Sequence, residues 1–261
     1  MIWLGENAQS PCLKITVIIP CYNESESIAN VIKGFPINSL KKNDYELEVL
    51  VIDNNSTDNT AEFAKNAGAR VIIEPNKGKG YAMRTGFANV SSDTDYVAMI
   101  DGDDTYSSSE LLRLIEPLQS NFCDAVMGSR LAGRMHDDSM KTFNRGGNWV
   151  YTHMVRIVYR VNITDVLTGY FAWNKIALDE LAPHLRSSGF AIEMEMVTKM
   201  ARIGHEIYSV PISYHPRSGQ TNLRPIYDGS RILKTFMKSL IWKPSMISDP
   251  IYNTTSNLRD D

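Results

Sequence analysis

The sequence predicts an α/β fold in which a mostly parallel sheet is flanked by helices within a single domain. The chain has 261 residues, 43% of them apolar, so it can bury a sizeable core. Short apolar runs alternate with segments in which apolar residues recur at helical spacing, and no repeat or linker divides the chain. The runs that we expect to be strands cover residues 15–19, 47–52, 70–73, 96–100 and, as a fifth, 125–128.

Helices are expected between these strands. Pro20 ends the first strand, and Asn23 with Glu26 then forms a capping-box pattern at the start of a helix. That helix has one apolar face at the spacing 0, 3, 4, 7, formed by Ile28, Val31, Ile32 and Phe35. Between the fourth and fifth strands, Ser107 and Glu110 repeat the capping pattern ahead of a second apolar face, formed by Leu111, Leu114, Ile115 and Leu118.

The second half of the chain is less regular. We expect a long helix over residues 144–160, a strand over 170–173, a helix over about 193–203 and a last helix over about 228–242. The last helix carries Arg231, Lys234 and Lys238 opposite an apolar side. That pattern fits a helix lying in a membrane interface, and equally one that packs its apolar side on the domain.

Composition excludes several classes of protein. The net charge of −3 argues against sequence-independent nucleic-acid binding. Three scattered cysteines predict no disulfide framework, and the start of the chain lacks the pattern of a signal peptide. No apolar run approaches the roughly 18 residues that span a bilayer. We therefore expect a cytoplasmic protein, or one that lies on the cytoplasmic membrane face without crossing it.

Charge is unevenly divided along the chain. Residues 1–130 have 11 Lys and Arg against 18 Asp and Glu, whereas residues 131–261 have 16 against 12. This asymmetry suggests that the two halves meet partners of different charge.

Carboxylates follow three of the predicted strands. Glu24 comes after the first strand, Asp53 after the second, and Asp101 and Asp103 after the fourth. In parallel sheets ligands bind at the carboxyl ends of the strands, so these side chains are expected at one rim. Two aspartates spaced around Gly102 can present oxygens to Mg²⁺ or Mn²⁺, which one or two carboxylates and substrate phosphates typically hold. The alternative for this motif is an ordinary turn.

A glycine-rich segment, residues 76–86, is a second candidate site. Glycines at a helix start let backbone N–H groups approach an anion, and Lys79 or Arg84 could neutralise a phosphate. The spacing differs from that of a Walker loop. The alternative is a solvated basic loop with a glycine cap.

Together these motifs resemble those of the family 2 glycosyltransferases, which have the Rossmann-like GT-A fold. The resemblance covers roughly residues 14–240 and is closest to the polyprenyl- or dolichyl-phosphate glycosyltransferases, such as dolichyl-phosphate mannose synthase and its glucose relatives. Five segments of the second half point to that group: residues 128–130, 144–148, 165–170, 189–195 and 210–219. It implies a domain over residues 1–248, with a nucleotide-sugar half at about 14–130, an acceptor half at about 131–245, and a polar, disordered tail over 249–261.

The resemblance also implies roles for individual residues. The nucleotide-sugar would be held by Pro20, Tyr22, Glu24, Asp53, Lys79, Asp101, Gly102 and Asp103. Asp101 and Asp103 would hold the Mg²⁺ or Mn²⁺, which offsets charge on the leaving diphosphate. The acceptor phosphate would be bound by Arg130, Arg145 and Arg217, because a guanidinium can engage phosphate oxygens bidentately. Asp103, Arg130 and Arg217 would be the catalytic residues.

The implied reaction is an inverting transfer of a hexose from a nucleotide-sugar to a polyprenyl phosphate, dolichyl or undecaprenyl, for glycan assembly. A phosphate monoester is mostly dianionic at neutral pH and needs no base, so Glu193 and Glu195 are expected to position groups. A polyprenyl acceptor implies that the protein meets a membrane surface or a membrane partner protein.

Two departures from the family pattern leave the donor open. No lysine follows Arg217 closely, although Arg224 is a candidate substitute, and Thr105 stands where some relatives carry a better metal ligand. The donors considered are UDP-glucose, UDP-N-acetylglucosamine and GDP-mannose, with a slight lean to UDP from Thr168-Gly169-Tyr170.

Three other functions remain open. The first is transfer to a soluble saccharide or small-molecule acceptor. The second is a nucleotidyltransferase, which the residues after the first strand disfavour because they lack a glycine-rich basic loop. The third is a non-catalytic nucleotide-sugar-binding subunit, which the intact Asp101, Asp103 and Arg217 disfavour.

Overall fold

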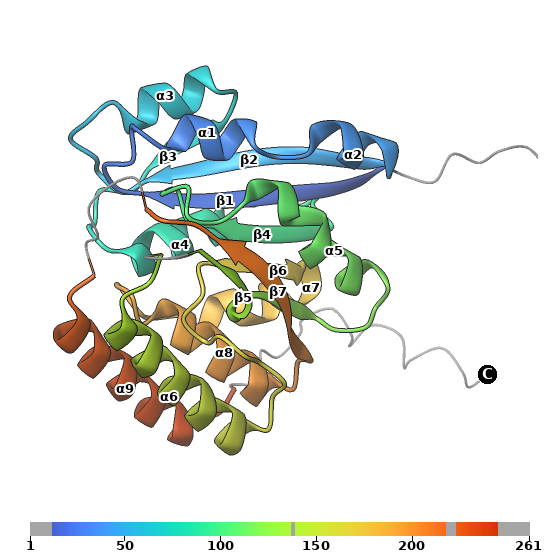
Figure 1. The fold of residues 1–261 in the computed structure, drawn as a ribbon. Coiled ribbons are helices and arrows are strands. Elements are labelled where there is room, and N and C mark those ends of the chain that lie inside the picture. Colours follow the sequence, from blue (N-terminus) through green and yellow to red (C-terminus); the bar gives the residue numbers. More distant parts are fainter. Residues whose placement is uncertain (1–11, 137–138, 218–222, 245–261) are drawn as a thin grey trace, which may run out of the picture.

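A computed structural model describes residues 12–136, 139–217 and 223–244 (Figure 1). They form one seven-stranded sheet in the order β3-β2-β1-β4-β6-β5-β7. The strands are β1 (Leu13–Cys21), β2 (Tyr45–Asp53), β3 (Arg70–Ile73), β4 (Tyr96–Ile100), β5 (Ala125–Met135), β6 (Tyr170–Asn174) and β7 (Ile207–Tyr214). The predicted α/β fold with a mostly parallel sheet is therefore confirmed. The predicted tail, residues 249–261, lies outside the described residues.

The sheet contains one antiparallel strand. Neighbouring strands β3, β2, β1 and β4 are parallel, as are β5 and β7. β6 runs antiparallel to both β4 and β5, and so joins the two parallel groups. The sequence indicated β6 without its direction, and it did not indicate β7.

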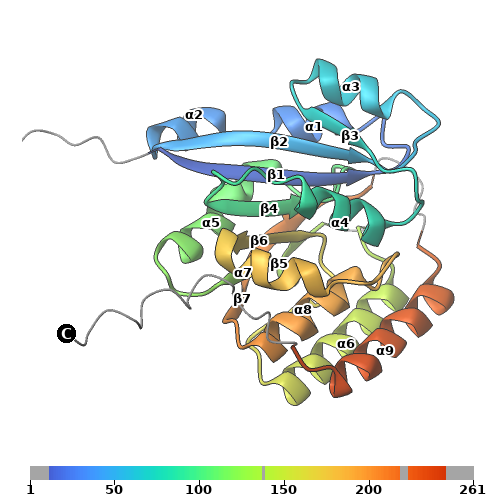
Figure 2. The same cartoon turned by 180° about the vertical axis from the view of Figure 1, so that it is seen from behind.

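Helices cover both faces of the sheet (Figures 1 and 2). One core contains side chains of α1, α2, α3 and α5, and the other contains side chains of α4, α6, α7, α8 and α9. The helices are α1 (Ile28–Lys33), α2 (Ile37–Lys42), α3 (Thr60–Asn66), α4 (Lys79–Ala88), α5 (Leu111–Gln119), α6 (Thr142–Tyr159), α7 (Lys175–Leu181), α8 (Ile192–Ile203) and α9 (Pro225–Ile241), with 3-10 turns at Ser108–Glu110 and Ala182–His184.

Strand β1 shows how the sequence produces the two cores. Successive side chains of a strand point to opposite faces, so Ile15, Val17 and Ile19 enter one core while Ile18 enters the other. Strands of this kind, apolar on both faces, are typical of parallel sheets covered by helices.

Both predicted capping boxes are wrong. Helix α1 begins at Ile28 after Ser27, and no side-chain cap is formed there. The Asn23 side chain instead accepts a hydrogen bond from the backbone N–H of Thr57, which joins the loops after β1 and β2. Ser107 likewise forms no side-chain cap.

Candidate active site

The sheet order brings the predicted carboxylates together. β2, β1 and β4 are neighbours, and the pairing of Cys21 with Asp53 aligns the ends of β1 and β2. Loops that are far apart in the sequence therefore begin side by side. Glu24, Asp101 and Asp103 lie at this rim, as the sequence analysis expected.

Arg217 reaches the rim from the second half of the chain. Its Nη2 lies 2.6 Å from Oε1 of Glu24, and its Nη1 lies 3.2 Å from Oδ2 of Asp103. The Arg217 Nε is buried and has no hydrogen-bond partner among the described residues. The arginine expected at the acceptor phosphate thus lies against two carboxylates expected at the donor.

Lys79 forms a second bridge at the rim. Its Nζ lies 2.6 Å from Oδ1 of Asp101 and 2.7 Å from Oε1 of Glu193, the second residue of α8. The other oxygen of Glu193 is buried without a partner in the described part of the chain. Glu193 thus positions a lysine at the rim, a pairing that the sequence did not reveal.

We call these six side chains the carboxylate rim: Glu24, Asp101, Asp103, Glu193, Lys79 and Arg217. Four acids face two bases, so the rim carries an excess of two negative charges when all are ionised. Burial raises the pKa of Glu24 to about 7, although Arg217 opposes the shift. Burial also raises the pKa values of Asp101 and Glu193 above their ordinary range, against the pull of Lys79.

This excess of charge fits a divalent cation. Among the described residues, no group of three or more His, Cys, Asp or Glu could hold a metal by itself. Asp101 and Asp103 supply two oxygen-bearing groups, and Mg²⁺ or Mn²⁺ sites of this kind take their other ligands from substrate phosphates and water. The residues present therefore fit a cation that binds together with a phosphorylated donor.

The other residues expected at the nucleotide line the same edge. Pro20 is the penultimate residue of β1, and the Tyr22 hydroxyl lies 3.0 Å from Nζ of Lys77. Asp53 is buried, and its Oδ1 accepts a hydrogen bond from the backbone N–H of Ser56. No side chain fits at position 102 without a shift of its neighbours, because a Cβ on Gly102 would lie 2.6 Å from Sγ of Cys21.

The glycines at the start of α4, Gly78 and Gly80, do not leave their N–H groups for an anion, which corrects the sequence-based expectation. The N–H of Gly78 donates to Oδ1 of Asn54, and that of Gly80 donates to the carbonyl of Ser188. A Cβ at Gly80 would lie 2.2 Å from the Ser187 carbonyl oxygen. These glycines instead let the start of α4 pack against the loop before α8.

Glu195 holds that loop. Its carboxylate accepts hydrogen bonds from the backbone N–H groups of Arg186 and Ser187, and Lys199 pairs with it at 2.5 Å. These bonds lower the pKa of Glu195 even though burial opposes them. Glu195 therefore holds the loop before α8, and its expected role in positioning reacting groups stays a prediction.

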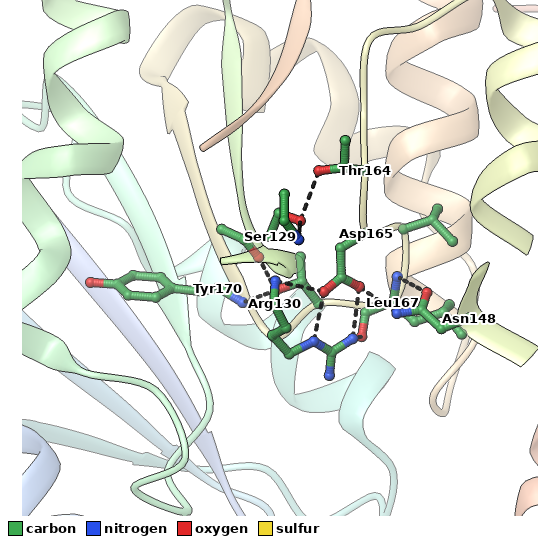
Figure 3. A network of polar contacts seen from close by, with 12 residues as sticks. Ser129, Arg130, Asn148, Thr164, Asp165, Leu167 and Tyr170 are labelled. Atoms are coloured by element: carbon green, nitrogen blue, oxygen red, sulfur yellow. Dashed lines mark hydrogen bonds and ion pairs between the residues drawn. The ribbon is translucent and has the colours of Figure 1, made fainter. Parts of the chain in front are cut away.

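Arg130 lies in a buried polar network (Figure 3). We call it the network beneath the rim, because its Leu167 lies two residues before Gly169, the backbone partner of Asp101. Its Nε and Nη2 form a bidentate ion pair with Asp165 at 2.7 and 2.8 Å, and Nη2 also donates to the carbonyl of Leu167. Asn148 donates to the same carboxylate. The structure does not bring Arg130 to the other predicted phosphate ligands, so that role stays a prediction.

The loop that leads from Asp165 into β6 reaches Asp101 at Gly169. The backbone N–H of Asp101 donates to the carbonyl of Gly169, and the Gly169 N–H donates to the hydroxyl of Tyr106. A Cβ at Gly169 would lie 2.0 Å from Oδ2 of Asp101. A glycine is therefore needed for the aspartate to occupy its position.

Arg145 is not brought to the rim. It is exposed in the first turn of α6, and its side chain forms no hydrogen bond or ion pair with another residue in the described ranges. Asp165 and Asn148, which the sequence analysis did not treat as site residues, prove central to the buried network. Both belong to segments that carried the family resemblance, and this was the only signal in the sequence that could have found them.

Comparisons with known proteins show the family to which the chain belongs. A family model for glycosyl transferase family 2 matches residues 16–181. Glycosyltransferase AglJ of Haloferax volcanii is 36% identical over 84% of this chain and 69% of that protein. The dolichyl-phosphate hexose transferase of the same organism is 28% identical over 86% of this chain and 92% of its own length.

A solved structure shares the fold. Glucosyl-3-phosphoglycerate synthase from Mycobacterium tuberculosis, in complex with Mn²⁺, UDP-glucose and phosphoglyceric acid, superposes with a TM-score of 0.66. The match has 21% identity and covers 87% of this chain and 80% of that one. At this identity the likeness shows the fold alone.

Proposed function

This chain belongs to glycosyltransferase family 2, and we propose that it transfers a hexose from a nucleotide-sugar to a polyprenyl phosphate, inverting the anomeric centre. The observation that carries the proposal is the position of Arg217. An acceptor-half guanidinium lies directly against Glu24 and Asp103, so a phosphate bound to it would lie beside the sugar donor.

The carboxylate rim has the groups that such a reaction requires. Asp101 and Asp103 would hold Mg²⁺ or Mn²⁺, which supplies charge neutralisation for the leaving nucleoside diphosphate. Lys79 and Arg217 add two fixed positive charges at the same place. Their preorganised charges cost no reorganisation when negative charge develops in the transition state.

No general base is required in this proposal. A phosphate monoester with a second pKa near ~6 is already a nucleophile at neutral pH. Glu193 is buried and paired with Lys79, so its role in this proposal is to orient the lysine. Catalysis then depends on alignment of the acceptor phosphate with the sugar and on neutralisation of the charge of the leaving diphosphate.

Two relatives support different acceptors. The dolichyl-phosphate hexose transferase favours a lipid phosphate, whereas glucosyl-3-phosphoglycerate synthase, crystallised with phosphoglyceric acid, favours a soluble one. Both acceptors carry a phosphate, which agrees with the arginine at the rim. A soluble phosphorylated acceptor is therefore the second candidate.

The test supplies the full chain with radiolabelled UDP-glucose, UDP-N-acetylglucosamine or GDP-mannose and Mn²⁺. One set of reactions contains polyprenyl phosphate, and a parallel set contains 3-phosphoglycerate. We expect label in the organic phase with one donor. If no donor gives label in the organic phase and label appears only in the aqueous product with 3-phosphoglycerate, the lipid acceptor is overturned and the second candidate is favoured.

The same assay tests Arg217. Arg217→Lys keeps the charge but loses the bidentate fork, so we expect a rise in KM for the acceptor of about 10-fold. Arg70→Lys is the matched control, because Arg70 also pairs with a carboxylate, that of Glu48, but lies at the start of β3, at the end of the sheet away from the rim. We expect it to leave this KM unchanged. An unchanged acceptor KM in the Arg217 variant would contradict its assignment.

A further inference from the structure

Exposed apolar side chains are concentrated on two helices. Ten of the fifteen large hydrophobic residues that are exposed in the described part of the chain belong to α6 or α9. They are Phe143, Trp149, Val150, Ile157 and Val158 on α6, and Ile226, Tyr227, Leu233, Met237 and Ile241 on α9. A cluster of this size marks an interaction site on a soluble domain.

Helix α6 is apolar on the side that faces away from the core. Asn148, Thr152 and Val155 are its buried residues, and they face the domain. On the opposite side Phe143, Val150 and Ile157 recur every seven residues, with exposures of 71%, 48% and 76%. Residues seven apart lie on one stripe of a helix, so this stripe is continuous along α6.

Helix α9 continues the apolar surface. It buries Ile232 and Phe236, while Leu233, Met237 and Ile241 form an exposed stripe at a spacing of four. The two helices lie side by side in both views (Figures 1 and 2), and the Tyr151 hydroxyl on α6 donates to the Gly229 carbonyl on α9. We call the two stripes together the α6–α9 face.

Basic residues flank the α6–α9 face. Arg145 and Arg156 are eleven residues apart on one side of α6, and Arg231, Lys234 and Lys238 share one side of α9. Helix α6 contains no acidic residue, and the single acid of α9, Asp228, is buried. The basic side of α9 also lines a cavity of about 620 Å³ together with Arg186.

We propose that the α6–α9 face docks on a lipid bilayer that contains anionic headgroups. Apolar side chains between rows of Lys and Arg match the two parts of such a surface, its acyl boundary and its negative charge. Both helices begin on the side of the molecule where β1 ends (Figure 1), which is the side of the carboxylate rim. The purpose of this docking rests on the proposed function, because docking would bring the carboxylate rim to a lipid-borne phosphate.

No described helix is long and apolar enough to cross a membrane. The face itself is composed of helices that pack on the domain through their other sides, so it binds as a surface and leaves the core intact.

The experiment measures flotation of the full chain with vesicles of phosphatidylcholine alone or with about 30% phosphatidylglycerol. We expect binding to the anionic vesicles that weakens at high salt. The double variant Ile157→Glu with Ile241→Glu places charges on the two stripes and should lower the partition coefficient at least about 10-fold. The matched control is Ile176→Glu on α7, where the isoleucine is 73% exposed, and it should bind like the wild type.

A second pair of variants tests the charges. Each Lys near an anionic surface contributes roughly 1 kcal/mol, so Lys234→Gln with Lys238→Gln should lower the partition coefficient by about 30-fold. Lys41→Gln with Lys42→Gln removes the same charge from α2, where both lysines are exposed, and should have little effect.

Three outcomes would overturn the proposal. The first is that the wild type does not bind anionic vesicles, and the second is that the face variant and its Ile176 control bind equally. The third is that the wild type binds no vesicles but forms a dimer in light scattering, which the face variant dissociates. The last outcome would assign the face to a second copy of the chain. Transfer to a short-chain polyprenyl phosphate in solution should be unchanged in the face variants, so failure of docking and failure of the proposed reaction are distinguishable.

Discussion

Two clusters of buried charge near the end of β4 handle negative charge in different ways. In the network beneath the rim, one carboxylate, Asp165, accepts four hydrogen bonds, three from Arg130 and one from Asn148. In the carboxylate rim four acids share two bases, and one oxygen of Glu193 has no partner in the described part of the chain. A carboxylate whose hydrogen bonds are all satisfied stabilises the fold. A group of carboxylates with too few positive partners can instead bind an incoming cation.

The largest expected effect comes from the rim. Asp103→Asn keeps the shape of the side chain and removes its charge, so we expect turnover to fall by about 10²–10³-fold or more. The free energy of unfolding should stay the same or rise, because the substitution reduces the excess negative charge of the rim, although it also weakens the contact of Asp103 with Arg217. Activity assays at saturating donor and urea unfolding measure the two effects.

Asp104→Asn is the control for this variant. It makes the same chemical change one residue away, outside the ion pairs of the rim, and Asn tolerates the positive φ of 60° at this position. We expect its turnover to stay within about fivefold of the wild type. Equal losses in the two variants would mean that Asp103 has no special place in the site.

The network beneath the rim should respond in stability. Asp165→Asn leaves the buried Arg130 guanidinium without its counter-charge, and we expect the free energy of unfolding to fall by about 3–5 kcal/mol. Replacing both partners, as in Arg130→Met with Asp165→Leu, should cost less than this single change. If Asp165→Asn unfolds like the wild type and loses only use of the acceptor, Arg130 is a phosphate ligand after all.

The rim also predicts a pH dependence. The pKa of Glu24 is about 7 in the folded protein against an ordinary value of 4.5, so between these values the folded state holds a proton that the unfolded state has released. The Glu24 contribution to stability is therefore complete below pH 4.5 and is lost as the pH rises to 7, by about 2–3 kcal/mol. Urea unfolding of the metal-free protein should show this fall, and Glu24→Gln should reduce it. A Glu24→Gln profile that parallels the wild type would contradict the assignment.

The connection between the two clusters gives the smallest expected effect. Gly169→Ala places a methyl group where Oδ2 of Asp101 now lies, and overpacking of this kind costs about 1–3 kcal/mol. We expect the Mn²⁺ concentration for half-maximal activity to rise as Asp101 is displaced. Gly146→Ala, where a Cβ meets no atom within 4 Å, should leave this concentration unchanged.

The fold was largely predictable because its signals are local. Apolar runs and helical spacing located the first five strands, β1 to β5, and the buried face of α5, since each signal lies within a dozen residues. Strand β7 was missed because Pro211 interrupts its apolar pattern and its pairing with β5 is a long-range contact. The direction of β6 depends on its partners and cannot be read from its five residues.

The candidate site was predictable only in part. Strand ends located Glu24, Asp101 and Asp103, because the parallel sheet collects the loops that follow its strands. The partners of those carboxylates were not visible, since Lys79 and Glu193 are more than a hundred residues apart and meet only after the start of α4 packs against the loop before α8. Because that packing is also long-range, the sequence wrongly suggested that Gly78 and Gly80 bind an anion. They instead make room for the backbone of Ser187 and Ser188.

Calorimetric titration of the wild type with UDP, in the presence and absence of Mn²⁺, tests most directly whether the rim is short of positive charge. An excess of two negative charges predicts that Mn²⁺ tightens UDP binding at least about 10-fold, or roughly 1.4 kcal/mol. Asp103→Asn should remove most of this difference. Equal UDP affinity with and without Mn²⁺ would contradict the central claim, because Lys79 and Arg217 would then suffice to neutralise the diphosphate.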